Sequence, residues 1–540
     1  MGTVLHNKKH HIFSDRRGDM LFLLSLIVIA MAAFTFLGSD SYVLFADSGS
    51  YIEMERYMEG VMPVYPLFIR LNKILFGEAV YLQAVVTEQA VFASVCVTVF
   101  TNLLRRQFRL GYPESYCLFL FSLLPFMTDM PDAMTTQEIL TEGIAYAGFY
   151  LFMAVLLKAV WTKKLGYILG LFIITLFLSA TRSQLQILFG ACGIIFFYIV
   201  VMGDGTKADR KRVLYVLSGI VGCLCIGLAG VSCTSRLSTG YQEMIRRYTA
   251  RLQAIEDAAL EEKTAAESGA EMSAGAVTQS SPENTEDSDS ETEWSAVPSQ
   301  YTSLIFARGM YEADYEDYQL FEEEEMRRLF LRLYETADEN EDLYIYASPG
   351  LWMWKDIVGG IGSVGNKCFY TLDDFYREMP GITQQNDYNQ IRNKSASQIG
   401  WTLLKAHWPR FLYHTLMLLP QAFICTVFFQ IARIYLLCHL VTLFLYVSAA
   451  ALMVWAYTDK KVDKAYGEFM AAVLGTNILM IIVISLVFFG QQRYLVYNFG
   501  IFYMVYFLFL LQLWKQYGKN WLERLNSRGA DKWRLTWRKS

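Results

Sequence analysis

An isolated carboxylate stands out in the stretch FADSGSYIEMERYMEGVMPVYPLF, which covers residues 45–68. Within it, Ser50 and Glu53 fit a helix capping box and Gly60 suits a helix end, so local helix formation explains these three residues. Asp47 lies ahead of the expected helix and has no such explanation. A loop carboxylate can accept the proton of an attacking hydroxyl group, which makes Asp47 a candidate general base. A solvated loop aspartate or an additional cap is the alternative.

A second carboxylate, Glu142, lies at the start of the apolar segment TEGIAYAGFYLF. Upstream of it, Thr135 and Glu138 fit another capping box, which gives Glu138 a structural explanation. Glu142 follows one turn later on the same helix face. A carboxylate at the beginning of an apolar helix is expected to face a cavity or a partner, so catalytic and structural interpretations of Glu142 both stay open.

Basic side chains supply candidate anion ligands. Arg182 in SATRSQ and Arg493 in GQQRYLVYN stand at the expected edges of membrane spans. Arginine binds phosphate oxygens through two parallel hydrogen bonds, so the two residues could hold a lipid-linked phosphate, and interfacial snorkelling is the alternative. His407, near Lys405 and Arg410, could contact a headgroup or could be an ordinary interfacial residue. No spacing resembles a zinc site, and binding of a divalent cation is left open.

Composition indicates the elements that must position these side chains. Hydrophobic residues make up 54% of the 540-residue chain and charged residues 18%. Several continuous apolar runs approach the roughly 20 residues that a helix needs to cross a bilayer. We therefore expect an all-α polytopic membrane protein. The expected spans, about ten, lie at 20–37, 80–104, 116–126, 139–160, 165–179, 185–202, 213–232, 436–457, 469–489 and 499–514.

The distribution of charge predicts the topology. Basic clusters alternate with the apolar runs, and the positive-inside rule then places both termini in the cytoplasm. The apolar segment 411–431 would place the basic TDKKVDK loop outside if it were a full span. An interfacial or re-entrant helix, broken at Pro420, is expected there instead.

Five regions follow from these patterns. The acidic, Ser-rich residues 255–300 cannot bury enough apolar surface to become ordered, which predicts a disordered insert. The regions are an N-terminal transmembrane module (1–233), an outer linker with the insert (234–300), an extracytoplasmic region with the interfacial helix (301–435), C-terminal transmembrane helices (436–514) and a basic cytoplasmic tail (515–540).

The first loop resembles a pattern in the GT-C superfamily of polyprenyl-phosphate-sugar glycosyltransferases, which includes protein O-mannosyltransferases and aminoarabinose transferases. The matching positions are Asp47, Tyr51, Gly60, Pro63, Tyr65 and Pro66. EILTEGIAYAGFYLF is similar to the start of the family's fourth span, with Glu142 at a recurrent glutamate, and TRSQ resembles its arginine turn after the fifth span. QRYLVYN, with Arg493 and Tyr494, resembles a late Arg-Tyr element. The likeness covers about residues 20–202 and, loosely, the last two spans.

This resemblance implies an inverting transfer in which Asp47 is the general base and a polyprenyl phosphate is the leaving group. Glu142 is the second expected catalytic residue. The expected substrate-binding residues are Tyr51, Arg182, Arg493, Tyr494 and His407. The family has two consecutive acidic residues at this point, whereas here Ser48 follows Asp47. The resemblance therefore does not extend to the second carboxylate that a divalent metal ion would use.

The expected partners are a polyprenyl-phosphate-linked sugar donor, a glycan, lipid or protein acceptor, and the lipid bilayer of a bacterial plasma membrane, with no nucleic acid. An envelope-polysaccharide polymerase or ligase is a neighbouring hypothesis. A lipid or oligosaccharide transporter is a different one, and Glu88 within the second span is its main indication. A non-catalytic protein that organises an assembly through the outer loop is the fourth hypothesis for the function.

Overall fold

The fold consists of helices. The computed structural model describes residues 16–38, 41–45, 47–52, 61–127, 134–202, 209–273, 300–350, 353–379, 385–428, 434–487 and 492–518. Within these ranges the only extended pairing is an isolated parallel bridge between Val43 and Glu138. An all-α architecture is therefore confirmed for the described part of the chain.

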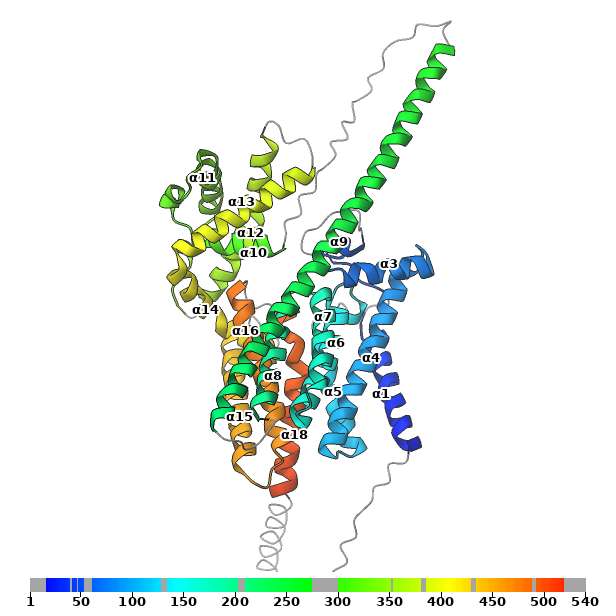
Figure 1. Cartoon of the computed structure of the whole chain (residues 1–540), viewed down its shortest axis with the longest axis vertical. Helices are drawn as coiled ribbons and strands as arrows, with labels where there is room; N and C mark the ends of the chain where they lie inside the picture. The colour runs from blue at the N-terminus through cyan, green and yellow to red at the C-terminus, as the bar shows by residue number, and fades with distance from the viewer. Residues whose placement is uncertain are drawn as a thin grey trace, which may run out of the picture.

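The larger part of the molecule is a bundle of apolar helices (Figure 1). Its members are α1 (Arg16–Phe36), α4 (Tyr81–Phe108), α5 (Tyr112–Ser122), α6 (Glu142–Thr162), α7 (Gly166–Thr181), α8 (Leu188–Met202), α9 (Asp209–Ser273), α15 (Tyr435–Thr458), α16 (Lys464–Val487) and α18 (Phe499–Leu513). The centre is α6, which is buried along most of its length and packs against α4, α7, α8 and α16. Two shorter helices, α2 (Ser48–Ile52) and α3 (Val64–Phe76), lie at one end of this bundle.

Length and composition make this a multi-pass membrane protein. Eight of the described helical stretches are long and apolar enough to cross a bilayer. The two remaining expected spans correspond to α7, with 16 residues, and α5, with 11. Large apolar side chains such as Val28 of α1, Leu228 of α9 and Phe444 of α15 are exposed on the bundle surface. Such a surface suits contact with lipid rather than water.

The expected boundary at residue 233 falls inside a continuous helix. Helix α9 continues without interruption from Asp209 to Ser273 and extends far beyond the bundle (Figure 1). The expected linker and the first part of the expected disordered insert, residues 255–273, are therefore helical. The segment AALEEKTAAESGAEM is rich in alanine, glutamate and other strong helix formers, which explains this outcome. The rest of the insert, residues 274–299, and residues 519–540 of the tail lie outside the described residues.

A second group of helices packs around a core of its own at one end of the bundle (Figure 1). We call it the α10–α14 unit. It comprises α10 (Gln300–Tyr311), α11 (Glu324–Glu339), α12 (Met353–Arg377), α13 (Gln385–Ala406) and α14 (Trp408–Val427). On α11 the buried residues Met326, Leu329, Phe330 and Leu333 recur with helical spacing and form one apolar face. That face packs on α12, so the unit is held by hydrophobic contacts.

Helix α14 enters the bundle beside α15 and runs in the same direction. Near the start of α15, Tyr435 donates a hydrogen bond to the Gln421 side chain, and further along both helices the hydroxyls of Thr426 and Tyr446 are 2.7 Å apart. Two consecutive full spans would run antiparallel, so the parallel direction agrees with a re-entrant helix. Pro420 lies inside α14, and the expectation that it breaks the helix is wrong.

Candidate functional site

Hydrogen bonds between two loops position Asp47. The backbone N–H of Val43 donates to the Gln137 carbonyl at 2.9 Å, and the N–H of Ile139 donates to the Val43 carbonyl at 3.0 Å. The buried Ser48 hydroxyl donates to the Ile139 carbonyl at 3.0 Å. Ser48, which stands where the family pattern has a second acid, therefore ties the loop of Asp47 to the segment before α6.

The structure tests the two expected capping boxes only in part, because one of them includes Glu53. Helix α2 begins at Ser48, and the Ser50 hydroxyl donates back to the Asp47 carbonyl at 2.5 Å; Glu53 lies outside the described residues. In the second loop the expected pair was Thr135 and Glu138, whereas the observed pair is one residue earlier: the Gln137 side-chain oxygen accepts the N–H of Met134 at 3.1 Å. The short helical turn therefore begins one residue before the expected position, and α6 starts only at Glu142.

Helix α4 fixes the beginning of α6. The side-chain amide of Gln89 donates to the carbonyls of Thr136 at 3.2 Å and Glu138 at 3.0 Å. Gly143 is pressed against the same amide, and a Cβ there would lie 2.6 Å from Gln89 Oε1. Glu142 therefore starts α6 at a defined depth, with a side chain that is only 5% exposed.

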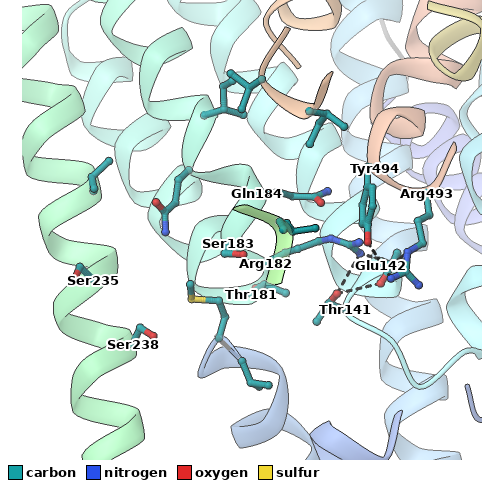
Figure 2. Close-up of a pocket in the computed structure, with 18 of the residues that line it drawn as sticks. Thr141, Glu142, Thr181, Arg182, Ser183, Gln184, Ser235, Ser238, Arg493 and Tyr494 are labelled. Carbon is teal, nitrogen blue, oxygen red and sulfur yellow. Dashed lines mark hydrogen bonds and ion pairs between the residues drawn. The ribbon is translucent and has the colours of Figure 1, made fainter. Parts of the chain in front are cut away.

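Four charged side chains form one continuous chain of ion pairs. Glu142 pairs with Arg182 through Oε1 and Nη1, and Nε of Arg493 lies 3.9 Å from the same carboxylate oxygen (Figure 2). Nη2 of Arg493 in turn lies 3.1 Å from Oδ2 of Asp47, across 446 positions of sequence. Along this chain of ion pairs the residues follow in the order Arg182, Glu142, Arg493 and Asp47, so positive and negative charges alternate. The Asp47 side chain is 43% exposed, so the chain leads from a buried carboxylate to an accessible one.

Two tyrosines complete this cluster. The ring of Tyr494 lies beneath both guanidinium groups, with centroid distances of 5.0 Å to Arg182 and 5.1 Å to Arg493. Tyr51 is buried and packs edge-on against Tyr65 at 5.3 Å. Burial, together with the nearby charge of Glu142, raises the pKa of Tyr51 to about 12. Its phenol therefore stays protonated at neutral pH and can donate a hydrogen bond.

A cavity of about 790 Å³ opens beside the cluster. Six of the seven residues expected from the sequence line it: Asp47, Tyr51, Glu142, Arg182, Arg493 and Tyr494. Helix α9 lines the cavity with Ser235, Ser238 and Thr239, and Figure 2 shows Ser235 and Ser238 across from the ion pairs. Sequence reasoning missed these three. Their spacing of three and four residues, which places them on one helix face, is the signal that could have found them.

The seventh expected residue, His407, does not reach this cavity. It belongs to the α10–α14 unit, where its Nε2 lies 2.7 Å from Oδ2 of Asp317. Asp314, Asp317 and His407 each offer an atom within 4.8 Å of the others and form the group among the described residues that could bind a cation. Arg410 already pairs with Asp314 at 2.8 Å and supplies positive charge there. In the cavity, arginines likewise occupy both carboxylates, so neither place is built chiefly for a metal ion.

The cavity combines three chemical environments. Asp47 can accept a proton, the two guanidinium groups can bind an anion such as a phosphate, and the hydroxyl groups of α9 can bind a polar, uncharged ligand. Apolar side chains of α16, including Val483 and Ile484, line part of the wall. Comparison with known proteins adds no relative, because neither the protein-family models nor the curated proteins that were searched contain a match to this chain.

Proposed function

We propose that this protein is an integral-membrane glycosyltransferase of the GT-C type, which transfers a sugar from a polyprenyl-phosphate carrier to an extracytoplasmic acceptor. The observation that carries the proposal is the meeting of Asp47, Glu142, Arg182 and Arg493 at one cavity. Independent structural roles for these four residues would not bring them together. The resemblance of their sequence segments to GT-C proteins supports the same function.

Each charged residue has a role in the proposed reaction. Asp47 takes the proton from the acceptor hydroxyl while the hydroxyl oxygen bonds to the anomeric carbon of the sugar. The bond between that carbon and the carrier phosphate breaks, and the phosphate leaves with the electron pair. Arg182 and Arg493 stabilise the charge that develops on the phosphate. Glu142, buried between them, is a positioning residue that orients both guanidinium groups.

The walls of the cavity suit the parts of such a donor. Val231 of α9 and Leu479, Val483 and Ile484 of α16 provide apolar surface next to the arginines, as the prenyl chain beside a phosphate requires. Ser235, Ser238 and Thr239 line the same cavity, and hydroxyl-bearing side chains suit the hydroxyls of a sugar. This division of the cavity supports a lipid-linked sugar over a wholly polar or wholly apolar substrate.

The transporter hypothesis loses its main support. Glu88 is exposed on the side of α4 and accepts a hydrogen bond of 3.1 Å from Asn72 of α3, and it does not line the cavity. A polymerase or ligase would use the same proton acceptor and phosphate ligands. The length of the glycan product separates the two hypotheses, because addition of a single sugar argues against a polymerase.

The test is transfer of a radiolabelled sugar from synthetic prenyl-phosphate donors by the purified full-length protein in lipid nanodiscs. Asp47→Asn should reduce transfer by at least about 100-fold, the usual contribution of a general base. Glu88→Gln, a carboxylate neutralised outside the cavity, is the matched control and should leave transfer unchanged. Full transfer by Asp47→Asn would remove Asp47 as the base, and movement of labelled lipid across vesicles without transfer would favour a transporter.

A further inference from the structure

A second cavity, of about 450 Å³, lies between the α10–α14 unit and the end of α16. It is adjacent to the first cavity, because Leu304 and Ile484 line the first while Ile305 and Leu486 line the second. Its walls are almost entirely apolar and aromatic, apart from Arg308 of α10 and Lys405 of α13. Neither of these basic residues has a part in the proposed reaction.

Arg308 is buried with two of its three nitrogen atoms unsatisfied. The side chain is fully covered, with 1% of the residue exposed. Its Nη2 donates to the Thr415 hydroxyl at 2.7 Å, and its guanidinium carbon lies 4.6 Å from the centre of the Phe411 ring. Nε and Nη1 have no hydrogen-bond acceptor among the described residues. Unpaired buried donors on a charged group are costly, so an acceptor bound in the cavity would stabilise this arrangement.

The nearest acidic residue is already engaged. Glu312 lies one turn along the chain from Arg308, but its two carboxylate oxygens lie 2.8 and 2.9 Å from Nδ1 of His414. Burial lowers the pKa of Arg308 to about 10, which leaves the guanidinium charged at neutral pH. The positive charge therefore faces an apolar cavity without a direct ion pair among the described residues.

The exposed residues that line this cavity are of a kind typical of membrane interfaces. Trp401 and Trp408 line it and are 42% and 61% exposed, and tryptophan is enriched at membrane interfaces. Leu486 is the last residue of a candidate membrane span. A ligand entering here would come from the interfacial region of the bilayer, with an apolar chain against the walls and an anionic group at Arg308.

We propose that this cavity is a second binding site, which takes a membrane amphiphile with a phosphate monoester or a similarly compact anionic group, and that Arg308 is its anion ligand. The site does not depend on the proposed sugar transfer. Its position beside the first cavity would allow two amphiphiles to bind side by side.

The test is equilibrium binding of radiolabelled farnesyl phosphate to the full-length protein in phosphatidylcholine nanodiscs. The binding curve should resolve a class of sites that corresponds to the second cavity. Arg308→Gln should lower the affinity of this class for farnesyl phosphate by at least tenfold. Arg328→Gln, which alters an exposed arginine of the same unit, should leave that affinity unchanged. Leu486→Trp fills the apolar wall without touching the polar contacts of Arg308, and it should remove the same class of sites. Arg493→Gln, in the first cavity, should leave this class intact.

Competition identifies the ligand chemistry. Neither farnesol nor inorganic phosphate should displace the probe from this class of sites. Farnesol lacks the anionic group that would bind Arg308, and inorganic phosphate lacks the apolar chain that would contact the walls. Equal competition by inorganic phosphate, or by farnesol, would overturn an amphiphile site. Unchanged binding in folded Arg308→Gln and Leu486→Trp would overturn the location. A protein that binds farnesyl phosphate in this way but shows no sugar transfer would refute the proposed function alone.

Discussion

Replacing Glu142 with glutamine removes one charge from a buried ion pair and preserves the size of the side chain. The side chains of Glu142 and Arg182 are only 5% and 11% exposed. Breaking a buried pair costs about 3–5 kcal/mol, because the remaining charge stays buried without its partner. The glutamine oxygen can still accept a hydrogen bond from Arg182, so we expect the lower end, a loss of about 3 kcal/mol in the free energy of unfolding.

The second ion pair of the chain provides an internal contrast. Asp47 and Arg493 are 43% and 40% exposed. Solvent screens such a pair, and its contribution is about 0–1 kcal/mol. Asp47→Asn should therefore change the free energy of unfolding by less than about 1 kcal/mol, even though the proposed mechanism requires it to reduce transfer by at least about 100-fold. Glu142→Gln should impair both stability and transfer.

Equilibrium unfolding of the full-length protein by sodium dodecyl sulfate in mixed micelles, followed by circular dichroism, measures the stability of each variant. Transfer is measured separately in nanodiscs. The double variant Glu142→Gln/Arg182→Met removes both buried charges, so it should be more stable than Glu142→Gln alone and still inactive. Unchanged stability in Glu142→Gln, or a double variant whose losses simply add, would refute the reasoning that the two charges compensate each other inside the protein.

Three further predictions concern other parts of the molecule. Arg493→Lys keeps the charge but lacks the forked guanidinium, so transfer should fall about tenfold or more, with a larger effect on binding of the lipid phosphate than on folding; equal kinetics would contradict this. Burial works against ionisation of Asp314, but the hydrogen bond and charge of Arg410 outweigh it and hold the pKa of Asp314 below its usual 3.8. The resulting stability is present above that value and is lost as the pH falls through the folded-state pKa, so Asp314→Asn should weaken the loss of stability measured as the pH falls below about 4. A Cβ at Gly309 would lie 2.6 Å from the carbonyl oxygen of Gly400, and Gly309→Ala should therefore destabilise the packing of α10 on α13 by about 1–3 kcal/mol, seen as faster proteolysis of this unit.

Much of the membrane architecture could be predicted because its causes are local. A segment in lipid must satisfy its backbone hydrogen bonds internally, so a continuous apolar run becomes a helix whatever lies beside it. Charged residues at the ends of apolar runs are also visible in the sequence, as Glu142, Arg182 and Arg493 show, and Asp47 stands out because helix capping does not explain it. Helix α9 shows the limit of this reasoning, since the acidic segment after residue 255 suggested disorder while its alanine-rich composition favoured helix.

What the sequence alone determined, then, is a polytopic helical protein with a few ionisable groups at the helix ends. Only the tertiary structure decided which of these groups meet. It joined Asp47 to Arg493 and Glu142 to Arg182, placed Ser235 of α9 across from them, and kept His407 away. The physical reason is that burial and ion pairing depend on how distant helices pack, and that packing is not contained in any local stretch of residues.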